Sequence, residues 1–263
     1  MKVLLVGHVS VDVFSDELRI GGPPTFQAPL FLNWGYEVTI LTSASKNFPF
    51  LRHPKLNIFN IPSEQTTTFE FELNEDGSRK LTLLRRASDL PPKLPFQDRF
   101  DLAIVSPICG EVSIDLLGSI RSQAKLVAGD VQGFIRSVDA NGIVFHKTSI
   151  DWGLFSPFFD ILKGSDEEML ELPPHPSFYY VQTRGANPVI ICKSDQLLEF
   201  KIQSVPPSEI VDSTGSGDIF LASFSHAFIH SNDLKKAVEF GNRIAINNLF
   251  KKGAPQLQSG NES

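Results

Sequence analysis

Short apolar runs typical of buried strands alternate along this chain with segments of helical character. The opening run, Lys2–Gly7 (KVLLVG), is nearly all apolar and ends at a glycine, and the run DLAIVS at 101–106 has the same character. Strands buried on both faces read as continuous apolar runs. Such strands alternating with helices are typical of a parallel sheet covered by helices. We therefore expect a three-layer, Rossmann-like α/β fold with a mainly parallel central sheet.

The same patterns predict most of the remaining elements. A helix opened by prolines and closed by Gly35 is expected over 23–34, and two more over 217–230 and 233–250, the last capped by Asp233. Further strands are expected over 37–42, 125–128, 159–162, 178–182 and 189–192, with a short helical stretch after the first of them.

Two segments break this alternation. Residues 13–20 alternate between polar and apolar like one exposed strand, and residues 66–73 and 80–86 are typical of a hairpin around Asn74–Gly77. Half-exposed strands belong to a separate small sheet rather than to a buried parallel one. We interpret them as a β-sheet lid over one edge of a single domain, residues 1–255, followed by a polar tail, 256–263. The alternative is a surface excursion without a role.

Composition excludes several classes of function. The 263 residues carry 24 Lys and Arg against 30 Asp and Glu, a net charge of −6. No basic stripe is present to neutralise phosphates, so we expect no nucleic-acid partner. No apolar run approaches the ~18 residues of a membrane span, and Gly7, His8 and Asp12 interrupt the opening run, unlike a secretory signal. We expect a cytoplasmic protein in which Cys109 and Cys192 are buried thiols.

The segment with the clearest chemical content is Ile210–Asp218 (IVDSTGSGD), which leads into a helical pattern. Gly215 and Gly217 allow backbone N–H groups to point at one spot without interference from a Cβ atom. The N-terminus of a helix adds free N–H donors and partial positive charge, which together make an anion site. Asp218 then lies in the first turn, beside the expected anion.

That aspartate has two interpretations. A carboxylate beside a phosphate suits phosphoryl transfer, in which it orients the attacking hydroxyl and accepts its proton. Alternatively, it is an ordinary acidic residue that stabilises the helix dipole. The segment is not a P-loop, because no GxxxxGK[ST] pattern is present. Spacing alone leaves both interpretations open.

The segment Asp212–Asp218 closely resembles the D-[ST]-T-G-A-G-D signature of the ribokinase-like (PfkB) carbohydrate kinases. Other landmarks of that family follow in its order: Gly7–Asp12 resembles G-x-x-x-x-D, Gly21–Gly22 the glycine pair before a helix, Lys163–Glu168 the K-x-N-x-x-E element, Thr183–Gly185 the T-x-G strand end, and Lys252–Ala254 the K-G-A after the last helix. Within the family, DVQGFIR at 130–136 is similar to a motif of the myo-inositol kinase-like subgroup.

The resemblance implies an ATP-dependent phosphotransferase that acts on a hydroxyl of a small polyol or sugar, an inositol among the candidates. It implies that Asp218 is the catalytic base and that the N–H groups of Gly215, Ser216 and Gly217 form the anion hole. It also gives the lid a role, which is to exclude water that would otherwise take the phosphoryl group.

The resemblance also assigns binding residues. For the acceptor these are Asp12, Gly22, Pro23, Gln132 and Arg136, and for the nucleotide Ser165, Thr183, Gly185, Asn242 and Gly253. Mg²⁺ would ride on the ATP phosphates with its waters facing Glu168, and Asp212 would support a monovalent cation of the kind that members of the family often use. A homodimer through the lid sheet is expected because that sheet is a dimerisation surface in similar proteins.

Two departures from the family pattern bear on function. Ser216 replaces the usual alanine, a small change because the backbone N–H does the binding. Ser165 stands where asparagine is more common, which puts the affinity for nucleotide and Mg²⁺ in question.

Alternative functions remain open at this point. A nucleoside acceptor would stack on aromatic residues of the lid, where Phe69 and Phe71 are available. A phosphosugar would need a cationic clamp, for which Arg85, Arg86 and Arg136 are candidates. The remaining alternative is a non-catalytic protein that senses a polyol or nucleotide.

Overall fold

The computed structural model describes residues 1–15, 17–73, 79–147, 151–168 and 178–258. Its strands are β1 (Lys2–Val6), β2 (Ser10–Val13), β3 (Leu18–Gly21), β4 (Glu37–Ala44), β5 (Leu56–Pro62), β6 (Thr67–Leu73), β7 (Arg79–Arg85), β8 (Phe100–Val105), β9 (Ala124–Asp130), β10 (Arg136–Val138), β11 (Val144–His146), β12 (Ile161–Ser165), β13 (Tyr179–Arg184), β14 (Asn187–Lys193) and β15 (Gln196–Phe200). Its helices are α1 (Pro23–Asn33), α2 (Ile114–Gln123), α3 (Gln132–Ile135), α4 (Trp152–Phe155), α5 (Ser216–Ser231) and α6 (Leu234–Leu249), with short 3₁₀ turns at Ser156–Phe158 and Pro207–Glu209.

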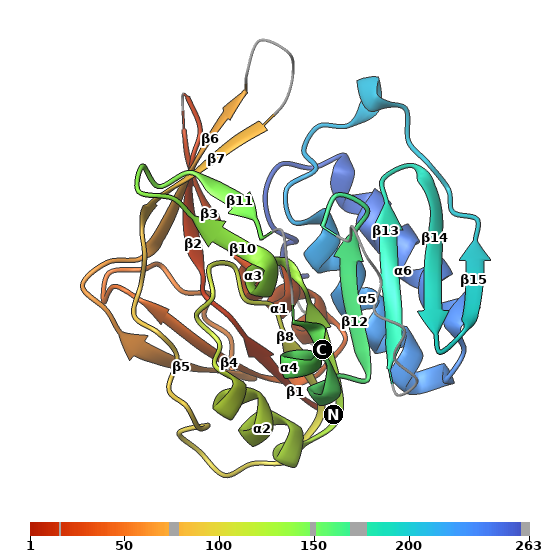
Figure 1. Cartoon of the computed structure of the whole chain (residues 1–263), viewed down its shortest axis with the longest axis horizontal. Helices are drawn as coiled ribbons and strands as arrows, with labels where there is room; N and C mark the ends of the chain where they lie inside the picture. Colours follow the sequence, from red (N-terminus) through yellow and green to blue (C-terminus); the bar gives the residue numbers. More distant parts are fainter. Residues whose placement is uncertain (16, 74–78, 148–150, 169–177, 259–263) are drawn as a thin grey trace.

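A nine-stranded sheet forms the centre of the molecule, in the order β15-β14-β13-β12-β9-β8-β1-β4-β5 (Figure 1). The strands from β13 to β5 are parallel to their neighbours. Only β14 and β15, at one edge, pair antiparallel. This confirms the mainly parallel sheet, and it brings the carboxyl ends of the parallel strands to one edge, where α/β proteins bind ligands.

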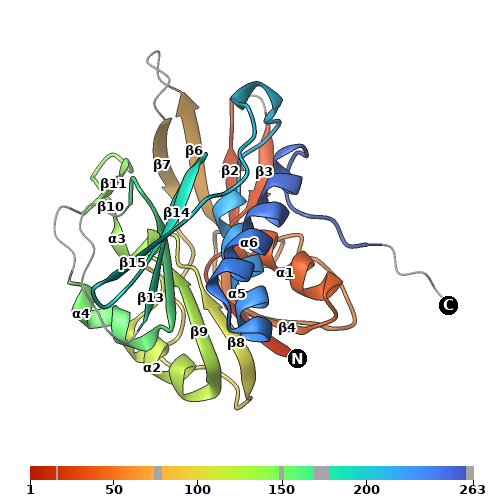
Figure 2. The same ribbon diagram turned by 90° about the vertical axis from the view of Figure 1, so that its right-hand side faces the viewer.

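Helices cover both faces of this sheet (Figure 2). Strand β1 shows why both faces must be covered: Val3 and Leu5 pack in the core beneath α1, α5 and α6, whereas Leu4 and Val6 pack in the core beneath α2 and α4. Successive side chains of a strand point to opposite faces. A run that is apolar at every position therefore needs a helical layer on each side, and the three-layer fold is confirmed.

The lid is a four-stranded sheet in the order β3-β2-β6-β7, which stands above the end of the central sheet (Figure 1). The hairpin expected over 66–73 and 80–86 is confirmed as β6 and β7, although its turn at Asn74–Gly77 lies outside the described residues. The single strand expected over 13–20 is wrong. The chain turns there, with Phe14 N donating to Glu17 O at 2.9 Å, and forms two antiparallel strands in which Val13 pairs with Leu18.

Three other elements differ from expectation. No helix follows β4 in the described residues 45–55, and the chain instead leads to a further parallel strand, β5. Helix α2 was not predicted, although Ser113 caps it by accepting a hydrogen bond from Leu116 N at 3.2 Å, as a capping serine does. The short hairpin β10–β11, which bridges to the lid at Thr82, was also missed.

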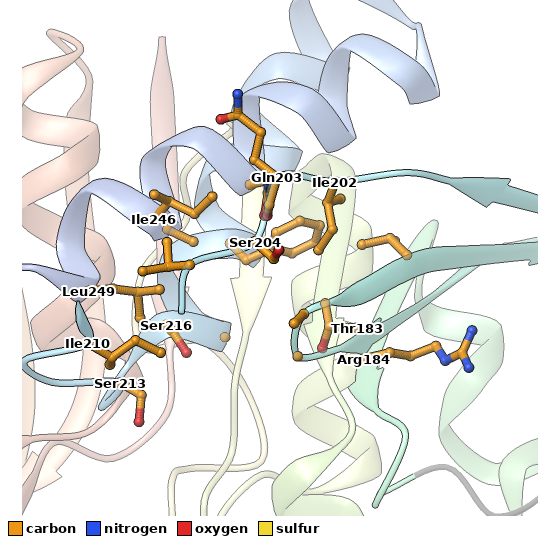
Figure 3. A pocket seen from close by; sticks show the side chains of 18 residues that line it. Thr183, Arg184, Ile202, Gln203, Ser204, Ile210, Ser213, Ser216, Ile246 and Leu249 are labelled. Atoms are coloured by element: carbon orange, nitrogen blue, oxygen red, sulfur yellow. Dashed lines mark hydrogen bonds between the residues drawn. The ribbon is translucent and has the colours of Figure 1, made fainter. Parts of the chain in front are cut away.

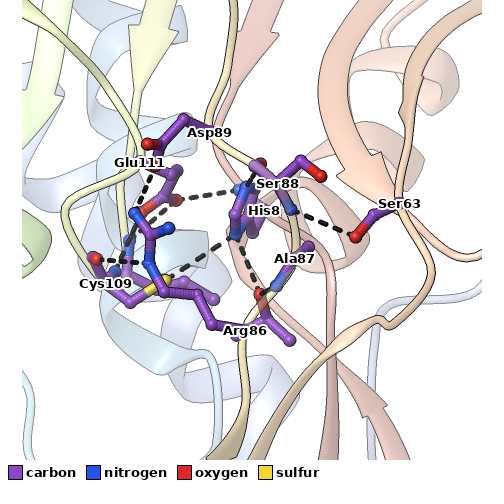
Figure 4. Close-up of polar contacts among 10 residues, drawn as sticks. His8, Ser63, Arg86, Ala87, Ser88, Asp89, Cys109 and Glu111 are labelled. Atoms are coloured by element: carbon purple, nitrogen blue, oxygen red, sulfur yellow. Dashed lines mark hydrogen bonds and ion pairs between the residues drawn. The ribbon is translucent and has the colours of Figure 1, made fainter.

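A buried polar network fastens the base of the lid to the central sheet (Figure 4). His8, which follows β1, contacts Thr67 Oγ1 through Nδ1 and Ser88 O through Nε2, both at 2.9 Å. Since a carbonyl can only accept, Nε2 carries the proton. The carboxylate of Glu111 accepts from the backbone N–H of His8 at 2.9 Å and from that of Cys109 at 2.9 Å. The ends of β1 and β8 and the lid strands are thereby tied together.

No helix in the described part of the chain is long and apolar enough to cross a membrane. The homodimer through the lid sheet stays a prediction. Cys109 and Cys192 are free thiols, each half-buried.

Candidate active site

A left-handed glycine begins the helix that carries the candidate site. Gly215 precedes α5 with φ of 72°, and a Cβ atom added there would lie 2.3 Å from the ring of Phe26. Only glycine meets both conditions at no steric cost. The turn thus presents the start of α5, where an anion could bind. In this structure the N–H of Ser216 donates to Ser213 O at 3.2 Å, so it would have to exchange that bond for one to an anion.

Asp218 lies in the first turn of α5, half-buried among other charged side chains. Burial, and then the negative charge of Asp130, raise its pKa to about 7, against the opposing effect of Lys163. A carboxyl group with a pKa close to neutrality is suited to accept and return a proton. This raised pKa is compatible with the role predicted for Asp218, which stays a prediction.

A buried ion pair packs against the glycine turn. Lys163 and Asp130 are directly paired residues of the adjacent strands β12 and β9, and Lys163 Nζ donates to Asp130 Oδ2 at 2.7 Å. A Cβ atom at Gly217 would lie 2.8 Å from the same Nζ, so the ammonium group sits against the glycine turn. Burial lowers the pKa of Lys163, but Asp130 more than offsets this and the pKa is raised overall. Lys163 is therefore a cation.

Glu168 belongs to the same group of charged side chains as Lys163 and Asp130. Its carboxylate accepts from Ser165 N at 2.9 Å, and Gln132 Nε2 lies 3.4 Å from it. Burial favours the neutral form, but Lys163 and the hydrogen bond from Ser165 outweigh burial and lower the pKa of Glu168. It is a carboxylate with free acceptor capacity, and carboxylate oxygens are ligands that Mg²⁺ or its waters prefer.

The predicted acceptor residues come from the lid and from the start of α1. Asp12, on β2, is 6% exposed and accepts from Ser10 Oγ at 2.8 Å. Burial raises its pKa to about 6. Gly22 is held by the backbone of the segment after β1, since a Cβ there would lie 2.5 Å from His8 O, and Pro23 is the buried first residue of α1.

Arg136 joins the lid to the charged group around Asp218. Its guanidinium donates to Ile108 O at 3.3 Å and lies 5.9 Å from the ring centre of Phe69. Burial lowers its pKa, while Glu168, Asp130 and Asp218 are near enough to oppose that change. The arginine therefore lies between Phe69 of the lid and the charged group around Asp218, and its role in binding an acceptor stays a prediction.

An apolar cavity of about 250 Å³ opens beside the glycine turn (Figure 3). The end of β13, the segment 202–205, the loop before α5 and one side of α6 enclose it. Its apolar lining is Val189, Ile202, Val205, Ile210, Phe220, Ala245, Ile246 and Leu249. A cavity of this kind, with anion-binding N–H groups at one end, is shaped for a ligand with a flat apolar part and a phosphate tail.

Five of the residues assigned to phosphate or nucleotide line this cavity, and three, Gly215, Ser165 and Gly253, do not. The lining residues are Thr183, Gly185, Ser216, Gly217 and Asn242. Ser165 lies one strand away, paired with Thr183, and the N–H of Gly253 donates to Asp212 Oδ2 at 3.1 Å. The roles assigned to these residues stay predictions.

Asp212, expected to support a monovalent cation, already faces a cationic side chain. The guanidinium of Arg19, on β3 of the lid, lies 3.3 Å from Asp212 Oδ2. Burial opposes ionisation of Asp212, but hydrogen bonds from Thr214 and Gly253 and the charge of Arg19 lower its pKa.

Sequence reasoning missed three residues of this site. The sequence analysis named Lys163 and Asp130 only as parts of motifs. Their positions at the ends of predicted strands, next to polar residues, could have marked them as candidates for the site. Arg19 carried no signal, because the contact joins residues 193 positions apart.

The fold and this site define a ribokinase-like α/β protein with a β-sheet lid. Residues 164–258 match the model of the pfkB family carbohydrate kinases. The matched region includes the Asp212–Asp218 motif, in agreement with the resemblance seen in the sequence.

Relatives in this family act on different acceptors. The chain is 26% identical to an inositol 3-kinase of Arabidopsis thaliana, in an alignment that covers 97% of this chain and 76% of that protein. It is 24% identical to a cytidine kinase of Thermococcus kodakarensis, in an alignment that covers 96% of this chain and 98% of that one. A solved structure of a pyrophosphate-dependent myo-inositol-1 kinase converted into a myo-inositol-3 kinase shares the fold, with a TM-score of 0.80 at 20% identity, covering 97% of this chain and 95% of that one.

Proposed function

We propose that this protein transfers the γ-phosphoryl group of ATP to a hydroxyl of a small polyol, with an inositol as the first candidate. The observation that carries the proposal is the position of Asp218. It lies in the first turn of α5, beside an anion-binding turn that also lines an apolar cavity. A base, a phosphate site and a site for a nucleoside adjoin one another, as phosphoryl transfer from a nucleotide requires.

Each part has a defined task in this reaction. Asp218 orients the acceptor hydroxyl and takes its proton, while the N–H groups of 215–217 stabilise charge on the transferred group. Mg²⁺, when bound, neutralises charge on the donor phosphates, and Glu168 is placed to hold its waters. The lid, which carries Asp12, excludes water from the transfer.

A nucleoside acceptor is the second candidate, and the lid supplies the reason. The rings of Phe14 and Phe71 stack on the lid with their centres 5.0 Å apart and their planes 10° apart, and an aromatic surface of this kind can receive a base. The inositol candidate is supported by Asp12, since a buried carboxylate binds polyol hydroxyls, and by the inositol 3-kinase relative, which aligns with 97% of the chain.

The proposal is tested by measuring ATP consumption with Mg²⁺ against inositols, nucleosides, sugars and phosphosugars. Turnover on an inositol, at a higher kcat/KM than on any nucleoside, supports it. Preference for a nucleoside selects the second candidate. Binding of nucleotide without turnover on any acceptor favours the sensor.

The identity of the donor depends on the apolar cavity. We expect Ala245→Phe, which places a ring in the cavity, to raise the KM for ATP at least about 10-fold, because a ligand that loses about 55 Å² of buried apolar area loses about 1.4 kcal/mol, a factor of ten in affinity. Asn247→Phe, on an exposed position of the same helix, is the control and leaves the KM unchanged. Pyrophosphate has no apolar part, so a protein using it as donor would tolerate Ala245→Phe in full.

Turnover is expected to fall in acid. Burial and the charge of Asp130 raise the pKa of Asp218 to about 7, and a general base acts only when deprotonated. The kcat/KM should therefore rise with pH and level off above about 7, losing about tenfold per pH unit well below that value. A profile that stays flat from pH 8 down to pH 5 would contradict this role for Asp218.

A further inference from the structure

The lid and the glycine turn are joined by one half-buried guanidinium. Arg19, on β3, contacts Asp212 on the loop before α5, at 3.3 Å between Nη1 and Oδ2. The same guanidinium lies 4.2 Å from the ring centre of Phe14 and pairs with Glu17. These contacts fix its direction, since a stacked and paired arginine has few other conformations.

Asp212 in turn fixes the shape of the loop that leads to Gly215. Its Oδ1 accepts from Thr214 N at 2.9 Å, and its Oδ2 accepts from Gly253 N at 3.1 Å. Its side chain is 7% exposed, against 25% for that of Arg19. A carboxylate this deeply buried is costly unless it is paired as well as hydrogen-bonded. The lid thus supplies the only cationic side chain that the described residues place within 4 Å of it.

A second ion pair also joins the β2–β3 hairpin of the lid to the rest of the molecule, but at a more exposed position. Glu17 of the lid contacts Lys252, after α6, at 2.7 Å, but the lysine side chain is 58% exposed. Exposed pairs contribute little, because water screens them. The Lys252 pair is therefore a matched comparison for the Arg19 pair, since it spans the same gap at the surface.

We propose that Arg19 is a positioning residue for phosphoryl transfer: by pairing with Asp212 it orders the Gly215–Gly217 turn when the lid covers the site. This inference rests on the proposed function. Arg19 is the direct neighbour of Asp12 across the β2–β3 hairpin. The movement that brings Asp12 to an acceptor therefore also brings the guanidinium to Asp212, and the anion hole is completed when the acceptor is enclosed.

The first test uses amide hydrogen exchange and needs no substrate. Arg19→Ala is expected to speed exchange at least about tenfold in the peptide covering 212–218, because Asp212 loses its partner and the loop opens more often. Lys252→Ala should leave exchange of that peptide at the wild-type rate. Equal exchange in wild type and Arg19→Ala would overturn the proposal, whatever reaction the protein catalyses.

The second test is kinetic. Arg19→Ala is expected to lower kcat by up to about 10²-fold, the effect of a small misplacement of a reacting group, with a smaller change in KM. Arg19→Lys, which keeps the charge, should restore part of the loss. Free guanidinium at millimolar, non-denaturing concentration should also restore part of it, whereas sodium chloride at equal ionic strength should not.

Three results would contradict this kinetic role. They are a kcat for Arg19→Ala within twofold of that of Lys252→Ala, restoration by sodium chloride equal to that by guanidinium, and a loss confined to KM. If wild type transfers phosphate to no acceptor, the proposed function fails, while hydrogen exchange still decides whether Arg19 orders the turn.

Discussion

Asp218→Asn is expected to lower turnover by about 10²–10⁴-fold, the usual effect of removing a positioned base. The same change should raise the melting temperature at pH 8. The pKa of Asp218 is raised to about 7, so the fold favours the protonated form, and the stability that this proton contributes is lost as pH rises through 7. Asparagine resembles the protonated form and keeps that stability at pH 8.

Both effects are measured on one pair of proteins. The melting temperatures of wild type and Asp218→Asn should approach each other as the pH falls from 7 toward 3.8, the ordinary pKa of an aspartate, because only below that value is the carboxyl group protonated in the folded and in the unfolded chain. Asp166→Asn, at an exposed carboxylate near the site, is the control and should change neither turnover nor the melting temperature. If Asp218→Asn turned over at a rate close to that of wild type, Asp218 would not be the general base of the reaction.

Lys163→Met is expected to lower the free energy of unfolding by about 3–5 kcal/mol, the cost of leaving one member of a buried ion pair without its partner. Lys163 and Asp130 are both nearly inaccessible, with side chains 7% and 6% exposed. Adding Asp130→Asn should recover most of the loss, because the double variant buries no unpaired charge. The asparagine Oδ1 can still accept from Gln132 N, as Asp130 does at 3.0 Å.

Urea unfolding of the single and double variants measures this coupling. Lys125→Met is the control, because Lys125 pairs with Asp101 but is 77% exposed, and its loss should be below about 1 kcal/mol. If the double variant is no more stable than Lys163→Met, the pair contributes through packing rather than through charge.

Local signals predicted the elements with the strongest patterns. The apolar run of β1, the prolines that begin α1 and the capping Asp233 of α6 each depend on residues next to one another, and each was confirmed. Residues 13–20 were misread because alternation continues across a tight turn: both strands of the hairpin expose every second residue, and nothing in the pattern marks Phe14 and Glu17 as the place where the chain reverses.

The residues of the candidate site were likewise predictable only where they are neighbours in the sequence. The glycine turn and Asp218 are contiguous in sequence, so a motif could reveal them. The partners that set the pKa of Asp218 lie on β9 and β12, and only the register of those strands places Lys163 against Asp130. The position of a charged residue at a strand end can be seen in one sequence, but the identity of its partner on a neighbouring strand cannot.

The hydrogen bonds of His8 hold the lid at its base and leave its far end free of this restraint. Thr67 and Ser88, at the base of the lid, are hydrogen-bonded to His8, so we expect a movement of the lid to be a rotation about this base. When a body rotates, atoms farther from the axis move farther. Arg19 lies toward the turn of the β2–β3 hairpin, away from the base of the lid. We therefore expect a rotation of the lid to separate Arg19 from Asp212 before it breaks the contacts of His8.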